Sequence, residues 1–122
     1  MNENYPFSEF MKIKLTSISE NSAEGELRYD KNLSDMLGHM TGAAYNALCD
    51  AVGGACARAT GDMYVTQNCS MQYYVSTEAE DEMLFAKAVL RHRGSRTCIV
   101  DVELTHKDGV IAADGQFSYS KL

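Results

Sequence analysis

The chain has 122 residues, of which 45% are hydrophobic and 23% are charged, and its formal net charge is -6. This length and apolar content predict one compact domain, residues 1–122, with a core large enough to fold unaided. The negative charge argues against nucleic acid or an anionic membrane surface as the main partner, because both repel an acidic protein.

The start of the chain, MNENYPFSEFM, lacks the charged-then-apolar pattern of a signal peptide, and no apolar run is long enough to span a membrane. We therefore expect a cytoplasmic protein. The cysteines have neither C-x-x-C spacing nor the density of a disulfide scaffold, so they are expected to be reduced and mostly in the core. The histidines stand far apart and form no metal-binding pair, which argues against a metal site.

In chain order, the hydrophobic patterns predict two strands, one long helix and then four strands. That order is typical of an α+β protein in which an antiparallel sheet curls around a single helix. A short helical turn is expected at residues 6–11, strands at 12–19 and 23–29, the long helix within 38–57, and further strands at 64–75, 82–93, 97–106 and 110–120.

The long helix contains one acid, Asp50, among small apolar residues. A stripe of alanines at helical spacing is expected to face the sheet, while Asn46, Asp50, Gly53 and Gly54 fall on an adjoining face that is polar or bare. An unpaired buried charge is expensive, so the carboxylate indicates a site. The same face could instead meet a partner subunit, with the two glycines allowing close approach.

Thr41 is a good helix N-cap and places Gly42 in the first turn. The N–H of Gly42 then has no partner within the helix. Such an amide is a suitable donor to a developing oxyanion.

The loop and helix together resemble the hotdog-fold acyl-CoA thioesterases of the phenylacetate-degradation type, within the 4-hydroxybenzoyl-CoA thioesterase superfamily. The family signature is an Asn, a Gly three residues on, His-Gly-Gly, and then Leu-x-Asp. The resemblance runs from about residue 35 to 117, and the signature is answered here by Asp35, Gly38, Thr41-Gly42-Ala43 and Leu48-Cys49-Asp50, followed by the strand-like runs VTQNCSMQYYVST, AKAVLRHRGSRTCIVDVEL and KDGVIAADGQFSY.

The resemblance implies a hotdog fold and hydrolysis of an acyl-CoA thioester without metal or redox cofactor, in a homodimer or homotetramer. It implies that Asp50 is the catalytic carboxylate, acting as general base on water or as nucleophile. It also implies that the amide of Gly42 polarises the thioester carbonyl and that Thr66 helps to hold the hydrolytic water.

The spacing of Gly42 and Asp50 constrains the assembly. At about 1.5 Å per residue, two positions eight apart on one helix are separated by about 12 Å along its axis. The two groups cannot both contact one carbonyl. If both act, Gly42 of one subunit must work with Asp50 of another, and the site lies at a two-fold dimer interface.

Three positions of the substrate-binding signature depart from the family. Thr41 replaces the histidine, Ala43 replaces the second glycine, and Asp35 replaces the asparagine. An ionised Asp35 cannot donate a hydrogen bond to a carbonyl oxygen, whereas an amide can. Asp35 is therefore expected either to turn away or to be held protonated by a second carboxylate nearby.

Basic and aromatic residues offer further candidates for substrate contact. Arg91, Arg93 and Arg96, with His92, cluster at a predicted hairpin and could clamp the phosphates of CoA, although solvated hairpin charges are common. The tyrosines of the third strand could line an acyl tunnel, but filling the core is the safer interpretation for Tyr64, Tyr73 and Tyr74.

Two other functions remain open. A non-catalytic acyl-CoA or fatty-acyl binding module on the same dimer would suit the altered Asp35 and Thr41. A hotdog dehydratase or hydratase is disfavoured, since it needs a placed catalytic histidine and His39 stands two positions before the matching place.

Overall fold

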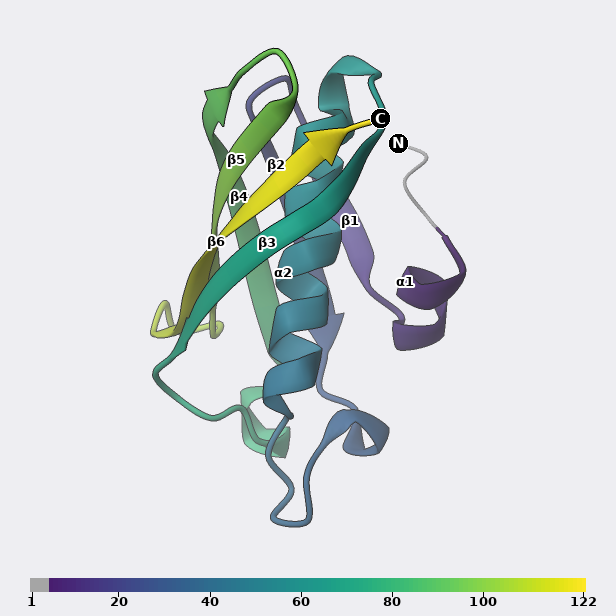
Figure 1. Cartoon of the computed structure of the whole chain (residues 1–122). Helices are drawn as coiled ribbons and strands as arrows, with labels where there is room; N and C mark the ends of the chain where they lie inside the picture. Colours follow the sequence, from purple (N-terminus) through teal and green to yellow (C-terminus); the bar gives the residue numbers. More distant parts are fainter. Residues whose placement is uncertain (1–4) are drawn as a thin grey trace.

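The computed structural model describes residues 5–122, in which a six-stranded antiparallel sheet wraps around one long helix (Figure 1). The predicted architecture is thus confirmed, with strands in the spatial order β1-β2-β4-β5-β6-β3. Residues 1–4, which open the segment without a signal-peptide pattern, lie outside the described residues. The main elements are α1 (Pro6–Met11), β1 (Lys14–Ile18), β2 (Ser22–Arg28), α2 (Gly42–Ala57), β3 (Tyr64–Tyr73), β4 (Met83–Arg93), β5 (Thr97–Thr105) and β6 (Ile111–Lys121).

The predicted elements are all present, with bounds that differ by one or two residues. Three short 3-10 helices within residues 5–122 were not predicted: η1 (Lys31–Leu33), η2 (Arg58–Thr60) and η3 (Ala79–Asp81). Each is a single turn in a connection, too short to produce a hydrophobic period in the sequence. The turn between β5 and β6 contains Gly109 at φ 90°, a left-handed conformation that glycine adopts without strain.

Helix α2 begins at Gly42 because Thr41 caps it. The Thr41 Oγ1 atom accepts a hydrogen bond of 3.2 Å from the N–H of Ala44, as the sequence predicted. Small and branched apolar residues of α2, among them Leu48, Val52 and Ala55, are fully buried against the sheet. Their burial fixes which face of the helix remains open.

Gly53 and Gly54 of α2 do not lie on that open face, which corrects one of our expectations. A Cβ atom at Gly53 would lie 2.5 Å from the hydroxyl of Tyr119, on the protein's own sheet. A Cβ atom at Gly54 would lie 2.9 Å from the guanidinium of Arg58. Both glycines are buried within the subunit, so their small size serves intramolecular packing.

Within residues 5–122, strand β3 forms one edge of the sheet and pairs only with β6. Most of its side chains are exposed, and its pairing register shifts between Thr66 and Asn68. A register shift of this kind bends the strand and redirects side chains next to it. Thr66 of this edge strand contacts Asp50 of α2, so the edge strand and the open face of the helix lie on the same side of the molecule.

The cysteines are free, and three of the four, Cys49, Cys56 and Cys98, are buried as predicted. Cys69 on β3 is exposed, and its sulfur accepts a hydrogen bond of 3.5 Å from Asn46 on α2. Burial raises the pKa of the Cys56 thiol to about 11, which keeps that thiol protonated. None of the helices in residues 5–122 is both long and apolar enough to cross a membrane.

Candidate active site

Asp50 lies half-buried on α2, and its carboxylate is held by two hydroxyl groups from the sheet. Thr66 Oγ1 donates a hydrogen bond of 2.7 Å to Asp50 Oδ1. The hydroxyl of Tyr119 lies 3.3 Å from the same oxygen and 3.2 Å from the backbone oxygen of Asp50. Thr66 and Tyr119 are cross-strand partners in the β3–β6 ladder, so one rung of the sheet supplies both donors.

Tyr119 is a site residue that our sequence analysis did not single out. Burial, reinforced by the negative charge of Asp50, raises the pKa of Tyr119 above its ordinary value, so the phenol remains a donor. The alternation of buried residues in β6 places Phe117 and Tyr119 on the helix side. That alternation was visible in the sequence, but the register that sets Tyr119 opposite Thr66 was not.

Gly42 is the first residue of α2 and is exposed to solvent. Among residues 5–122 no acceptor is found for its N–H, as expected for the first turn of a helix. Thr41 fixes this turn in place, because its hydroxyl donates a hydrogen bond of 3.1 Å to the backbone oxygen of Leu33. The predicted oxyanion donor is therefore held and open.

A groove of about 490 Å³ runs along the open face of α2 and includes both Gly42 and Asp50. The two residues stand at opposite ends of it, about 12 Å apart along the helix axis at the rise of an α-helix. One subunit therefore does not bring the two groups onto one carbonyl. The groove is lined by Phe7, Gly42, Ala43, Asn46, Ala47, Asp50 and Tyr73.

A second hollow, of about 250 Å³, adjoins the other side of Gly42. Tyr73 and Tyr74 line it and are 52% and 56% exposed, so the expectation that they fill the core is wrong. Tyr73 is the last residue of β3, and Tyr74 follows it where the strand ends, so neither side chain is covered by the helix. Tyr64 at the start of β3 is 3% exposed and does belong to the core, as expected.

The carboxylate of Asp35 is turned into its own loop. Its Oδ1 atom accepts hydrogen bonds of 2.8 Å from the N–H of Leu37 and 3.0 Å from the N–H of His39. The hydrogen bond from His39, supported by that from Leu37, holds the pKa of Asp35 below its ordinary value although desolvation opposes this. Of the two expectations for this residue, a protonated donor is the one that the structure of the subunit contradicts.

The predicted basic cluster is divided among three environments. Arg93 points inward and donates hydrogen bonds of 3.0 Å to the Ala57 backbone oxygen and 3.4 Å to the Tyr64 hydroxyl. Arg91 is exposed and forms an ion pair of 3.3 Å with Asp101. Arg96 is exposed at the β4–β5 turn. Arg93 is thus already occupied at the end of α2, and the three side chains do not form one clamp.

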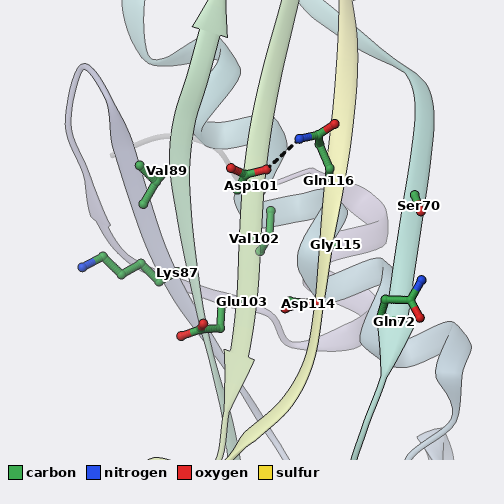
Figure 2. Close-up of a pocket in the computed structure, with 10 residues that line it drawn as sticks. All are labelled: Ser70, Gln72, Lys87, Val89, Asp101, Val102, Glu103, Asp114, Gly115 and Gln116. Carbon is green, nitrogen blue, oxygen red and sulfur yellow. Dashed lines mark hydrogen bonds between the residues drawn. The ribbon is translucent and has the colours of Figure 1, made fainter.

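A hollow of about 650 Å³ lies on the face of the sheet that points away from α2 (Figure 2). It contains none of the residues predicted for the site. Figure 2 shows acidic and amide side chains of β5 and β6 along it, with Gln116 donating a hydrogen bond of 3.0 Å to Asp101. In residues 5–122, no three side chains of His, Cys, Asp or Glu come together in a way that could hold a metal ion.

Comparison with known proteins identifies the family. The sequence profile of the Thioesterase superfamily matches residues 37–113, which include α2 with Gly42 and Asp50. The chain belongs to the Thioesterase superfamily. A comparison with curated protein sequences found no match.

Solved structures of similar fold align with nearly the whole length of this superfamily member. Protein PA5202 from Pseudomonas aeruginosa is 25% identical, with a TM-score of 0.91 and coverage of 98% of this chain and 96% of that one. The PaaI protein from the phenylacetic acid degradation operon of E. coli is 19% identical, with a TM-score of 0.92 and coverage of 98% and 86%. Smu.793 from Streptococcus mutans UA159, solved bound to acetyl CoA, is 21% identical, with a TM-score of 0.90 and coverage of 100% and 95%.

These findings confirm the predicted hotdog thioesterase fold and family, and with them a thioester hydrolase as the class of enzyme. The superfamily match covers the loop-to-helix signature from residue 37 onward, including the residues that depart from the family pattern at Thr41 and Ala43. Thr41 caps α2, and Ala43 lines the groove beside Gly42. Both substitutions are therefore accommodated in the local structure of this thioesterase-superfamily chain.

Proposed function

We propose that the protein hydrolyses acyl-CoA thioesters at a site shared by two subunits. The observation that carries this proposal is the Asp50 carboxylate, which is fixed on one oxygen by Thr66 and shares a groove with the open amide of Gly42. Asp50 Oδ1 is occupied by hydroxyl donors, and Oδ2 has no partner among residues 5–122. That second oxygen is available to accept a proton from water.

The reaction follows from these groups. The amide of Gly42 donates a hydrogen bond to the thioester carbonyl, which favours charge on its oxygen in the transition state. Asp50 of the partner removes a proton from water as the water oxygen bonds to the carbonyl carbon. The carbon–sulfur bond then breaks, the thiolate of CoA leaves and is protonated, and the acid is released.

A two-fold dimer would allow Gly42 of one subunit to work with Asp50 of the other. The open face of α2 and the edge strand β3 lie on one side of the subunit, where an unpaired edge favours association with another strand. An isologous interface between antiparallel copies of α2 would bring Gly42 of each subunit toward Asp50 of the other and create two equal sites. A homotetramer would be a pair of such dimers.

The test separates the amide from the helix that carries it. Proline is tolerated at the first position of a helix but has no N–H, so Gly42→Pro removes the donor and leaves the helix start intact. Gly42→Ala is the matched control, because it keeps the N–H and its Cβ atom would lie at an ordinary 3.5 Å from Tyr73. We expect kcat on a panel of acyl-CoAs to fall about 100-fold or more in Gly42→Pro and far less in Gly42→Ala.

Mixing two inactive variants tests the shared site. In a heterodimer of Gly42→Pro and Asp50→Asn subunits, one site carries both changes and the other carries neither. Random exchange should therefore restore about one quarter of wild-type activity if each site uses both subunits. No recovery on subunit exchange would indicate that each chain works alone. Absence of turnover by wild-type protein, with CoA esters still protecting the fold, would favour the acyl-CoA binding module.

A further inference from the structure

A buried chain of polar side chains joins three elements behind the hollow of about 250 Å³ beside Gly42. Tyr45 of α2, Thr77 of the β3–β4 connection and His106 at the end of β5 are 3%, 0% and 6% exposed. The Tyr45 hydroxyl lies 2.5 Å from Thr77 Oγ1, and Thr77 Oγ1 lies 2.9 Å from His106 Nε2. Nothing in the proposed reaction uses these groups.

The direction of each hydrogen bond follows from the acceptors. The Tyr45 hydroxyl donates its single proton to the Val75 backbone oxygen at 2.8 Å, since a carbonyl oxygen can only accept. Thr77 must then donate to the Tyr45 oxygen. The proton between Thr77 and His106 therefore belongs to His106 Nε2, and burial raises the pKa of Tyr45, which keeps its phenol protonated.

His106 is oriented from its other side by an acid. Its Nδ1 atom lies 3.6 Å from Asp81 Oδ1 in η3. The ring is thus held between Asp81 and Thr77. Such fully satisfied buried networks fix the conformation of the backbone that carries them.

The backbone that this network fixes is the wall of the hollow. Val75, whose backbone oxygen accepts the hydrogen bond from the Tyr45 hydroxyl, lines the hollow, and so does Tyr45 itself. The carbonyl of Thr77 accepts a hydrogen bond of 2.9 Å from the N–H of Met40, another lining residue just before Gly42. Since drug-sized ligands need about 300 Å³ or more, a hollow of about 250 Å³ suits an acyl group and not a whole CoA.

We propose that His106 is a positioning residue for acyl selection: through Thr77 and Tyr45 it fixes residues 74–76 as part of the wall of an acyl pocket beside Gly42. This inference rests on the proposed thioesterase function, because the carbonyl bound at Gly42 is what directs the acyl group into the hollow. His106 contacts no reacting atom. It acts on which acyl group is accepted, not on the bond that breaks.

The experiment compares acetyl-CoA with hexanoyl-CoA and benzoyl-CoA. Thr77→Val keeps the shape of the side chain and removes the hydroxyl, whereas Thr77→Ser keeps the hydroxyl. His106→Leu removes the ring donor, whereas His106→Gln retains an N–H near the position of Nε2. We expect kcat/KM for the better of the larger substrates, relative to acetyl-CoA, to fall about tenfold in Thr77→Val and His106→Leu. Thr77→Ser and His106→Gln should restore the ratio.

A spectroscopic measurement tests the network without activity. Nitrogen-15 NMR of the wild-type histidine rings should find a proton on His106 Nε2 that is protected from exchange, and this protection should be lost in Thr77→Val. His92→Gln, at an exposed histidine of β4, is the control and should change neither the spectrum of His106 nor the substrate ratio.

The outcomes distinguish the two proposals. If wild-type protein hydrolyses thioesters but the ratio between substrates is unchanged in Thr77→Val and His106→Leu, only the acyl-selection role is overturned. An unprotonated His106 Nε2 overturns it as well. If wild-type protein hydrolyses none of the three thioesters, the proposed function fails and the inference that rests on it fails too. A loss of thermal stability with equal effects on all three substrates indicates a purely structural network and counts against the proposal.

Discussion

Thr66 and Tyr119 face each other across the β3–β6 ladder and direct their hydroxyl groups at the same oxygen of Asp50. The contact from Thr66 is short, at 2.7 Å, while that from Tyr119, at 3.3 Å, is shared with the backbone oxygen. The two hydroxyls therefore have different expected roles. Thr66 orients the carboxylate, and Tyr119 ties the middle of α2 to the sheet.

Removal of the Thr66 hydroxyl should impair catalysis more than stability. In Thr66→Val the shape is kept but Asp50 Oδ1 loses its shorter hydrogen bond, and the carboxylate is free to rotate away from the water. Misplacement of a catalytic group reduces rates steeply, and we expect kcat to fall by about 10- to 100-fold with KM little changed. Steady-state kinetics of Thr66→Val beside Thr66→Ser is the measurement. Equal kcat values in the two variants would argue that Thr66 is only a strand residue.

The Tyr119 hydroxyl and Gly53 should show strong coupling in a double-mutant cycle. A Cβ atom at Gly53 would lie 2.5 Å from that hydroxyl and 3.3 Å from Val102, so Gly53→Ala should destabilise the protein by about 1–3 kcal/mol. Tyr119→Phe alone removes a hydrogen bond, at a cost of about 1 kcal/mol. In the double variant the missing oxygen makes room for the methyl group, and the free energy of unfolding should exceed that of Gly53→Ala alone. Urea unfolding of the four proteins measures this, and simple additivity would contradict it.

The sequence was sufficient for the architecture, the helix cap and the position of Asp50, because these depend on local periodicity and on residue types with strong preferences. Thr41 followed by a run of small apolar residues specifies a capped, buried helix with little ambiguity. The neighbours of Asp50 were only half predictable. Tyr119 lies 69 positions from Asp50, and its proximity depends on the register of β3 against β6, including the shift after Thr66.

For the basic cluster, the sequence suggested a grouping of side chains that the structure does not contain. Neighbouring arginines in a sequence suggest one surface, but alternate residues of a strand point to opposite faces. The irregular pairing between Leu90 and His92 then changes that alternation, and Arg93 ends beneath the C-terminus of α2. The sequence alone could locate neither this irregularity nor the unpaired backbone oxygens at the end of α2 to which Arg93 donates.

Arg93 should contribute to stability and not to CoA binding. Its guanidinium donates to the Ala57 oxygen at the end of α2 and lies 5.8 Å from the centre of the Tyr64 ring. Loss of these contacts in Arg93→Ala should lower the free energy of unfolding by about 1–3 kcal/mol. Arg96→Ala, at the exposed turn, should leave stability unchanged and raise KM for acyl-CoA if that residue contacts the CoA phosphates. Thermal unfolding and steady-state kinetics of both variants test these roles. A raised KM in Arg93→Ala with normal stability would show that Arg93 binds CoA and does not serve stability.

Asp35→Asn, which introduces the residue of the family signature, should change the pH dependence of stability more than the activity. The folded protein holds the pKa of Asp35 below its ordinary value, so the stabilisation is fully present above about pH 4 and is lost as pH falls through the lowered pKa. The neutral amide keeps an acceptor for Leu37 and His39 but forms weaker hydrogen bonds than a carboxylate. Wild-type protein should therefore be the more stable of the two at neutral pH, and the difference should vanish in acid.

The activity of Asp35→Asn tests where this side chain points in the working enzyme. Because the carboxylate is engaged by its own loop, replacement by an amide should leave kcat/KM close to the wild-type value. Asp35→Ala is the matched control: it removes the acceptor, frees the N–H groups of Leu37 and His39, and should loosen the loop that leads to Thr41 and Gly42. A large gain of activity in Asp35→Asn alone would mean that Asp35 turns toward the carbonyl when substrate binds, where a donor assists the oxyanion and a carboxylate opposes it.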